Sequence, residues 1–260
     1  IKDNVSSAIF GVVVGDALGV PNEFKDRHHF DMSPVTDMEG YGTYNQEPGV
    51  WSDDSSLTLA TLDGLSSVGP LNEDKRFSDF LDYDDVMSRF CDWYFNAEYT
   101  PKNDVFDVGG TTLDAILEFH NSSVDALEAG GKGERSNGNG SLMRIIPAAL
   151  LIHYASLKYS FSLDEKMEIV HNLSKLTHGH KRSQMACGIY VIIAIELLKS
   201  RESDEDLMAI VDRGIEIAKD FYSQNDEFEE ELEHFDRVFS LEIPACPIDD
   251  IKSGGYVISS

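Results

Sequence analysis

The sequence predicts an all-α protein, and three observations support this fold class. Apolar residues recur at the three- and four-residue spacing of helices in most segments, and no segment alternates convincingly as a strand. Turns rich in glycine and proline separate the periodic segments. Of the 260 residues, 42% are hydrophobic, so the chain can bury a large core. We therefore expect a compact helical bundle that forms a single domain over residues 1–260.

The first expected helix spans residues 3–19. Its apolar residues are dense and fall on most of its circumference, so we expect burial on most sides. It ends at Gly19 and Pro21, and a turn-rich loop with several glycines and prolines follows. The next helix opens at Ser52.

The remaining helices follow from apolar spacing and from capping residues. Ser162 and Ser203 are expected N-caps. The expected ranges are 77–98, 107–120, 141–156, 163–177, 181–199, 204–222 and 226–240. Residues 121–140 resemble a linker and allow a domain boundary, but composition does not shift there, and a bundle needs helices from both halves. We therefore interpret the segment as a functional loop within one domain.

Charge and cysteine content limit the classes of partner. The chain has 21 basic and 47 acidic residues and a formal charge of −26, which argues against binding nucleic-acid backbones or anionic membranes. A small anionic ligand would need a metal, a helix N-terminus or a glycine-rich turn. The three cysteines are odd in number and far apart, which favours a reducing cytoplasm. We expect no membrane span, because no apolar run reaches the length of one. The oligomeric state is not predicted.

Four polar residues, Ser52 to Ser55, separate Trp51 from an apolar helical face. One interpretation is a helix N-terminus, because Ser52 can cap free N–H groups and Asp53 and Asp54 favour the positive end of the helix dipole. The other is a metal site, since adjacent carboxylates beside a hydroxyl are hard oxygen ligands for magnesium or calcium. These residues alone leave both interpretations open.

Two further segments combine acidic residues or glycines with helices. In GDALGVPNEF, Asp16 lies within the expected buried helix and Glu23 follows a proline-containing turn. A buried Asp is usually hydrogen-bonded to nearby backbone and a Glu after a turn is usually solvated, so either residue can be structural. In VFDVGGTTLDAI, Gly109 and Gly110 let backbone N–H groups approach a phosphate, or simply form a turn into a helix.

Two later segments suit ligand binding. In SNGNGSLMRIIP, residues 136–147, glycines and asparagines run into an expected helix N-terminus, which is a geometry that receives anions. Ser141 is a candidate cap, and a flexible loop with an ordinary cap is the alternative. THGH, residues 177–180, could be part of a zinc site, but no third ligand has suitable spacing. We therefore expect His178 to contact a ligand.

The order of the segments carries more information than any one of them. GDALGVPNEF, GVWSDDSSLTLA, VFDVGGTT, GNGSLMRIIPAA, THGHKRS and IKSGGYV together resemble the ADP-ribosylglycohydrolase family, which includes the dinitrogenase reductase-activating glycohydrolases. The similarity extends from about residue 5 to the C-terminal end. The resemblance implies an orthogonal helical bundle. It also implies a hydrolase that removes ADP-ribose from a modified protein or small molecule by means of two magnesium ions.

The resemblance also assigns residues to roles. It implies metal ligation by Ser52, Asp53 and Asp54, and catalysis by Glu23 with the same two aspartates. The implied substrate-binding residues are Gly109, Gly110, Asn139, Gly140, Ser141, Leu142, Met143 and His178. Glycosidic cleavage passes through an oxocarbenium-like sugar, so the implied metal pair suits the need to position hydroxyls and activate water.

The chain departs from the family pattern at its C-terminal end. Family members continue beyond IKSGGYV with a further helix and a second Asp-rich cluster, and this chain ends at Ser260 without them. We expect either an incomplete record of an active enzyme or a shortened protein with a weakened metal site. The alternatives are a non-catalytic ADP-ribose-binding or structural relative and a helical metal-dependent phosphohydrolase. The acceptor, whether arginine, serine, a nucleic-acid base or acetylated ADP-ribose, is not predicted.

Overall fold

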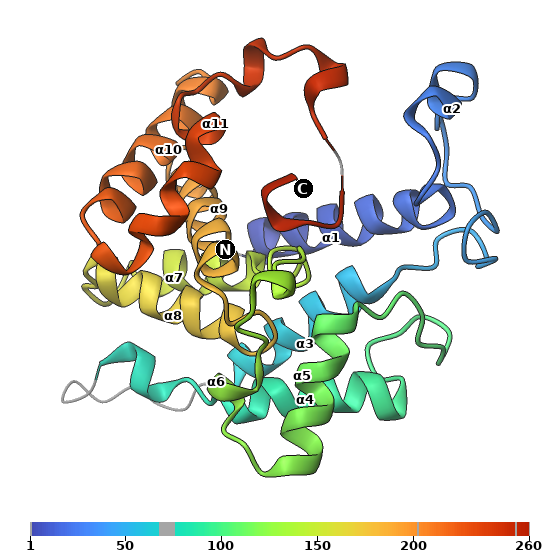
Figure 1. Ribbon diagram of the computed structural model, residues 1–260, viewed down its shortest axis with the longest axis horizontal. Coiled ribbons are helices and arrows are strands. Elements are labelled where there is room, and N and C mark those ends of the chain that lie inside the picture. The colour runs from blue at the N-terminus through green and yellow to red at the C-terminus, as the bar shows by residue number, and fades with distance from the viewer. Residues whose placement is uncertain (1, 68–75, 202, 253, 260) are drawn as a thin grey trace.

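Helices are the regular elements of the structure, a computed structural model that describes residues 2–67, 76–201, 203–252 and 254–259 (Figure 1). Within these ranges there is no strand, and the only β-type pairings are isolated bridges such as that between Gly138 and Tyr256. The predicted all-α class is therefore confirmed.

Eleven α-helices lie in the described ranges, joined by loops and short 3-10 turns. They are α1 (Lys2–Gly19), α2 (Arg27–Met32), α3 (Asp53–Ser66), α4 (Tyr83–Asn96), α5 (Gly110–Ser122), α6 (Ala126–Ala129), α7 (Ile146–Ala155), α8 (Leu163–Lys175), α9 (Lys181–Lys199), α10 (Leu207–Ser223) and α11 (Asp236–Phe239). The longest 3-10 segment, η4, spans Asp226–Phe235.

Local capping explains where several helices begin. Ser162 caps α8 in a capping box with Glu165, as predicted. The predicted cap at Ser203 is wrong, because the Asp206 side chain accepts from the backbone N–H groups of Met208 and Ala209 and so starts α10 there. The predicted helix over 141–156 begins five residues late, at Ile146, because the residues before it form a turn.

Two other predicted helices divide into separate elements. The range 77–98 contains a 3-10 turn, η2 (Phe77–Phe80), followed by α4, whose cap is Asp82. The range 226–240 contains η4 and then α11. Phe228, Glu231 and Phe235 are the buried residues of η4, and their spacing of three to four residues is compatible with the tighter 3-10 geometry.

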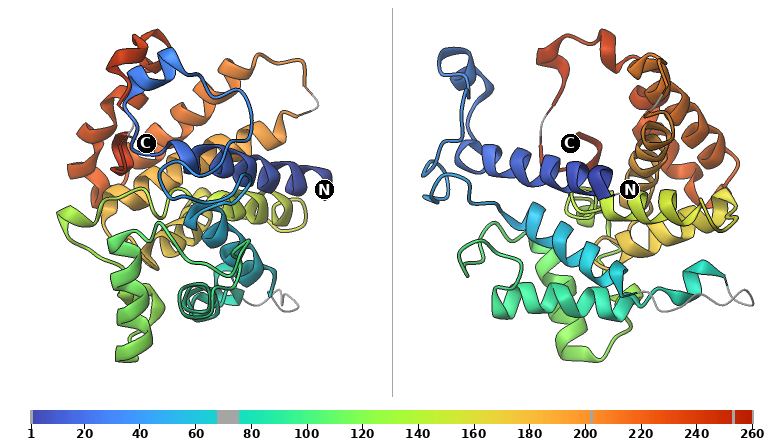
Figure 2. Two further views of the ribbon diagram at one scale, coloured as in Figure 1. Left: turned by 90° about the vertical axis from the view of Figure 1, so that its right-hand side faces the viewer. Right: turned by 180° about the vertical axis from the view of Figure 1, so that it is seen from behind.

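Helix α9 lies at the centre of one half of the bundle, against α7, α8 and α10, while α3 packs against α1, α4 and α7 (Figures 1 and 2). At Gly188 of α9, an added Cβ would lie 1.7 Å from the Tyr222 hydroxyl oxygen, so only glycine permits this approach of α10. One buried cluster, from Leu57 to Val257, draws on both sides of the 121–140 segment. That residues 1–260 form a single domain remains a prediction.

Helix α1 is much less buried than the sequence suggested. Phe10 is 68% exposed and Val14 46% exposed, and Ala17 is its only buried residue among those whose side chains are described. The expected burial on most sides is therefore wrong, because neighbours cover only one side of the helix. Residues 4–22 are also apolar and long enough, by length and composition alone, to cross a membrane, and little of this stretch is buried. This corrects the expectation that no apolar run reaches that length.

Acid sensitivity is expected from His171 on α8. Its Nε2 lies 2.9 Å from the Tyr222 hydroxyl, and burial, followed by the charges of Lys175 and Lys181, lowers its pKa from 6.5 to about 3. Between these values the unfolded chain binds a proton that the folded chain excludes, so stability falls as the pH falls from 6.5 to 3. One such group contributes a slope of up to about 1.4 kcal/mol per pH unit.

We expect His171→Gln to flatten the pH dependence of the free energy of unfolding, measured by urea denaturation between pH 7 and pH 4. His120→Gln, at the exposed end of α5, is the matched control and should keep the wild-type slope. Equal slopes for His171→Gln and wild type would contradict the assignment.

Candidate active site

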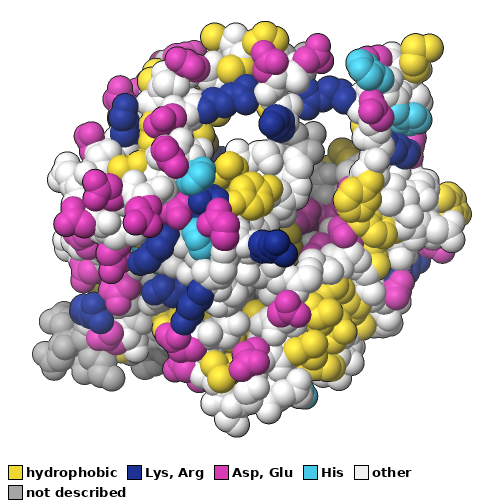
Figure 3. All heavy atoms as spheres, viewed as in Figure 1, with side chains coloured by type: hydrophobic (Ala, Val, Ile, Leu, Met, Phe, Trp, Pro, Cys, Tyr) yellow, Lys and Arg dark blue, Asp and Glu magenta, His cyan; other side chains and the backbone are white. Residues whose placement is uncertain are grey.

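Segments that are far apart in the sequence meet around one pocket of about 480 Å³. Its walls come from the loop after α1, the N-termini of α3 and α5, the glycine-rich segment 138–143, His178 and Gly255. Acidic side chains are visible inside the hollow on this face of the molecule (Figure 3). The pocket therefore combines carboxylates with turns whose backbone is accessible.

The start of α3 is held by Asp16 of α1. The Asp16 carboxylate accepts from the backbone N–H and hydroxyl of Ser52, the latter at 2.8 Å, and from the N–H and hydroxyl of Ser55 at 3.0 and 2.6 Å. The Ser52 hydroxyl in turn accepts from the Asp54 N–H at 3.3 Å, so the predicted capping role of Ser52 is confirmed. These bonds fix the helix end from which Asp53 and Asp54 line the pocket.

Burial and neighbouring carboxylates raise the pKa of three acids in the pocket. Burial, and then the charge of Asp54, raises the pKa of Asp53 well above its usual value. Burial, followed by Asp16 and Asp107, raises the pKa of Asp54 to about 7. Glu23 also has its pKa raised to about 7, by burial and then by Asp107, although it accepts a hydrogen bond from the Tyr44 hydroxyl at 3.1 Å. Among the described lining residues there is no lysine or arginine, so a cation would relieve this repulsion.

The donor set suits magnesium in its chemistry. Asp53, Asp54, Glu23 and Asp107 offer hard oxygen atoms, and magnesium is commonly bound through one or two carboxylates together with waters and substrate oxygens. Within the described part of the chain, no three His, Cys, Asp or Glu side chains form a ready ligand group. An ion here would therefore take its remaining ligands from water and from the bound molecule.

The pocket also presents backbone hydrogen-bond donors. Gly109, at the N-cap of α5, makes no side-chain capping bond, and the first turn of the helix lines the pocket. The backbone N–H groups of a first helical turn favour an anion. In the 138–140 segment, a Cβ at Gly140 would lie 2.8 Å from Cε1 of His178, so the backbone comes this close to the ring because residue 140 is glycine.

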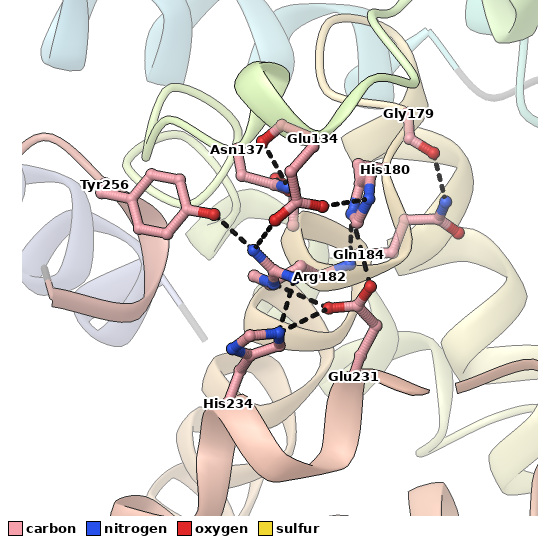
Figure 4. Close-up of polar contacts among 10 residues, drawn as sticks. Glu134, Asn137, Gly179, His180, Arg182, Gln184, Glu231, His234 and Tyr256 are labelled. Carbon is pink, nitrogen blue, oxygen red and sulfur yellow. Dashed lines mark hydrogen bonds and ion pairs between the residues drawn. The ribbon is translucent and has the colours of Figure 1, made fainter. Parts of the chain in front are cut away.

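Polar contacts around the buried Arg182 support the glycine-rich wall of the pocket. Arg182 of α9 donates to Glu134 at 2.6 Å, to Glu231 at 2.7 Å and to the Tyr256 hydroxyl (Figure 4). Because an arginine has only donors, the Nε2 atom of His234, 2.7 Å away, accepts from it. Three segments of the chain therefore meet at one buried guanidinium.

Backbone hydrogen bonds extend this support to the pocket itself. Asn139 N–H donates to the Gly255 carbonyl at 3.0 Å, and Val257 N–H donates to the Asn137 carbonyl at 2.9 Å. Asn139 and Gly255 both line the pocket. The segment around Tyr256 and the glycine-rich turn are thus joined as one wall.

A comparison with known protein families assigns the chain. The sequence pattern of the family described as ADP-ribosylglycohydrolase matches residues 1–260. The chain belongs to the ADP-ribosylglycohydrolase family. The resemblance inferred from the six sequence segments is therefore confirmed.

Individual relatives of this ADP-ribosylglycohydrolase chain are distant. It is 27% identical over 212 residues to the ADP-ribosylarginine hydrolase Tri1 of Pseudomonas putida (strain GB-1), covering 80% of this chain and 50% of the relative. It is 29% identical over 190 residues to the ADP-ribosyl-[dinitrogen reductase] glycohydrolase of Rhodospirillum rubrum, covering 72% and 55%. The alignments thus span about half the length of these curated relatives.

A solved structure supports the fold. The structure titled "ADP-ribosylglycohydrolase-related protein complex" superposes with a TM-score of 0.62 at 22% sequence identity, covering 97% of this chain and 70% of that one. The predicted helical architecture of the ADP-ribosylglycohydrolase type is therefore confirmed.

The structure brings together most of the site residues predicted for this ADP-ribosylglycohydrolase chain. Those that line the pocket are Glu23, Asp53, Asp54, Gly109, Gly110, Asn139, Gly140, Met143 and His178. Their catalytic, metal-binding and substrate-binding roles remain predictions.

Three predicted site residues do not line the pocket. Ser52 is buried behind it, with its hydroxyl engaged by Asp16. Ser141 is buried, accepts from the Ser174 hydroxyl at 3.0 Å and does not cap α7, whose N-cap is Ile145. Leu142 packs against the hydrophobic core.

Sequence reasoning missed several lining residues of this ADP-ribosylglycohydrolase chain, above all Asp107. In the segment VFDVGG the predicted ligand contacts were the two glycines. The acid that precedes them, Asp107, was the sequence feature that indicated a further pocket residue. Asp107 has a φ of 56°, a left-handed conformation that Asp tolerates better than most residues and that is often found at functional sites. The other missed lining residues are Phe24, Thr111, Thr112, Gly138 and Gly255.

Proposed function

We propose that this chain belongs to an enzyme that hydrolyses the glycosidic bond between ADP-ribose and a modified side chain or small molecule, with magnesium as cofactor. The observation that carries the proposal is a single pocket that combines carboxylates with backbone donors. The carboxylates suit ribose hydroxyls and a divalent cation, while the backbone donors suit a diphosphate. An ADP-ribosyl group carries both kinds of partner in one molecule.

The residues of the pocket suit the chemistry of glycosidic cleavage. The ribose develops positive charge in an oxocarbenium-like transition state, which nearby carboxylates stabilise. We assign Glu23 as the general base that takes a proton from the attacking water, since its pKa of about 7 suits proton transfer near neutral pH. Asp53 and Asp54 would hold magnesium, which supplies a bound water of lowered pKa and orients hydroxyls when present.

We place arginine first among the acceptors, because one relative is named an ADP-ribosylarginine hydrolase. Two alternatives to a glycohydrolase remain. One is a non-catalytic ADP-ribose-binding or structural relative. The other is a phosphohydrolase, which would attack the diphosphate in the same pocket.

The test is a product assay with the full-length protein. It should release free ADP-ribose from a panel of substrates modified on arginine, serine, a nucleic-acid base or acetate, with magnesium present and not after chelation. Binding of ADP-ribose without turnover of any panel member would favour the non-catalytic alternative. Release of inorganic phosphate or nucleoside monophosphate in place of ADP-ribose would favour the phosphohydrolase.

A further inference from the structure

We infer that Arg144, acting through Thr177, holds His178 as its Nε2–H tautomer, so that this histidine presents a fixed, neutral hydrogen-bond donor to an oxygen atom of the ligand. The three residues lie in contact from the core to the pocket. The identity of the ligand as ADP-ribose rests on the proposed function, but the tautomer does not depend on it.

The first step is the direction of the hydrogen bond between Arg144 and Thr177. Arg144 is fully buried, with its guanidinium carbon 4.7 Å from the centre of the Phe90 ring. Its Nη2 donates to the Leu173 carbonyl at 3.0 Å and to the Thr177 hydroxyl oxygen at 2.8 Å. A guanidinium has no acceptor, so Thr177 must accept in this contact.

The second step is the proton of the Thr177 hydroxyl. Thr177 is fully buried, and its hydroxyl oxygen lies 2.8 Å from Nδ1 of His178. Among the described residues this nitrogen is the only acceptor recorded for that proton. If Nδ1 carried a proton instead, the threonine proton would be buried without a partner, which is costly. Nδ1 therefore accepts, and the ring proton resides on Nε2.

The third step is what faces Nε2. His178 is 2% exposed and lines the pocket, opposite the glycine-rich turn. A Cβ at Gly138 would lie 3.4 Å from Nε2, so the facing wall at this point is backbone without side chain. No hydrogen bond joins Nε2 to any residue in the described part of the chain. Because His178 lines the pocket, its Nε2–H group is left for a ligand there to satisfy.

The charge state of the ring agrees with this geometry. Burial, and then the positive charge of Arg144, lowers the pKa of His178 to about 3, so the imidazole is neutral at physiological pH. A neutral ring with its proton on Nε2 cannot bind a cation through that nitrogen. It suits a phosphate or hydroxyl oxygen. The first turn of α5 is close by, since a Cβ at Gly140 would lie 2.8 Å from His178 Cε1 and 3.0 Å from the Thr112 hydroxyl oxygen. Arg144 and Thr177 are thus positioning residues for His178.

The tautomer can be read directly in the ligand-free protein. Long-range ¹H–¹⁵N spectra of histidine-labelled protein distinguish a protonated ring nitrogen from an unprotonated one. The chain has eight histidines, and the signal lost in His178→Gln identifies the relevant ring. We expect a protonated Nε2 and an unprotonated Nδ1. An unprotonated Nε2 on that ring in the wild-type protein would overturn the inference.

Matched variants test the relay. Thr177→Val removes the hydroxyl while keeping the shape, and should give a mixture of tautomers and weaken ADP-ribose binding about tenfold. Thr177→Ser restores a hydroxyl and should recover both the tautomer and most of the affinity. Unchanged tautomers in Thr177→Val would overturn the relay. A single Nε2–H tautomer retained in Arg144→Met would remove Arg144 from it.

These readouts separate the inference from the proposed function. A protonated Nε2 that depends on Thr177 supports the relay even if the protein releases no ADP-ribose, in which case the proposed function fails alone. Turnover of ADP-ribosyl substrates combined with an unprotonated Nε2 would support the function and refute the relay.

Discussion

Asp53→Ala and Asp54→Ala are each expected to abolish magnesium-dependent release of ADP-ribose, with a fall in kcat/KM of at least about 100-fold. Both side chains line the pocket from the first turn of α3, where their adjacent oxygen atoms would serve as hard ligands for a divalent cation. Helicity should be largely retained, because the bonds from Ser52 and Ser55 to Asp16 remain. Product release measured by chromatography, together with circular dichroism, checks both statements.

The matched control is Asp114→Ala on the exposed face of α5, outside the pocket. This variant also loses one carboxylate, so its net charge equals that of Asp53→Ala and Asp54→Ala. It should turn over substrate at the wild-type rate. If both variants at positions 53 and 54 keep normal turnover, the metal assignment is wrong.

The same site predicts that the free energy of unfolding falls as the pH rises, which is opposite to the effect expected from His171. Without magnesium, the ionised carboxylate of Asp54 is destabilising, because its pKa is raised from 3.8 to about 7 in the folded protein. Stability is thus lost as the pH rises through this range. Asp54→Asn should therefore melt at a higher temperature than wild type at pH 8 and show little difference at pH 4. A lower melting temperature at pH 8 would contradict the repulsion argument.

Glu23→Gln is expected to reduce kcat by about 10²–10⁴-fold while changing the affinity for ADP-ribose by only a few-fold, because the amide keeps the shape but cannot take a proton. The wild-type rate should rise with pH as Glu23 ionises. The midpoint should lie at or below about 7, because a bound cation lowers the pKa of the pocket carboxylates. Burial and Asp107 hold that pKa high in the metal-free protein.

Steady-state kinetics and ligand titration separate this role from simple positioning. Glu23→Gln should lose the rising limb of the pH–rate profile, because the amide that replaces the carboxylate does not ionise. Equal losses of kcat and of affinity would instead make Glu23 a residue that only positions the substrate.

Short-range interactions explain which parts of the fold could be read from the sequence. Helix periodicity and the caps at Ser52 and Ser162 depend on residues within a few positions of one another. The presence of these helices and the positions of these two caps could therefore be predicted from the sequence. The ordered motifs identified the family and most of the pocket lining. The start of α10 was missed because Asp206 competes locally with Ser203 for the cap, and capping preferences do not rank two such candidates.

The tertiary structure alone decided the electrostatics of the site and the exposure of α1. Asp16 and Ser52 are 36 residues apart, and Arg144 and Thr177 are 33 apart, so neither pairing is visible in local spacing. A pKa and a tautomer depend on which groups are desolvated and which atoms face each other, and these are set only when distant segments pack. The sequence by itself determined the helices, the family and the residue types of the pocket. Folding decided that Asp107 joins the acids, that Ser52 lies behind them and that His178 lines the pocket beside the glycine-rich turn.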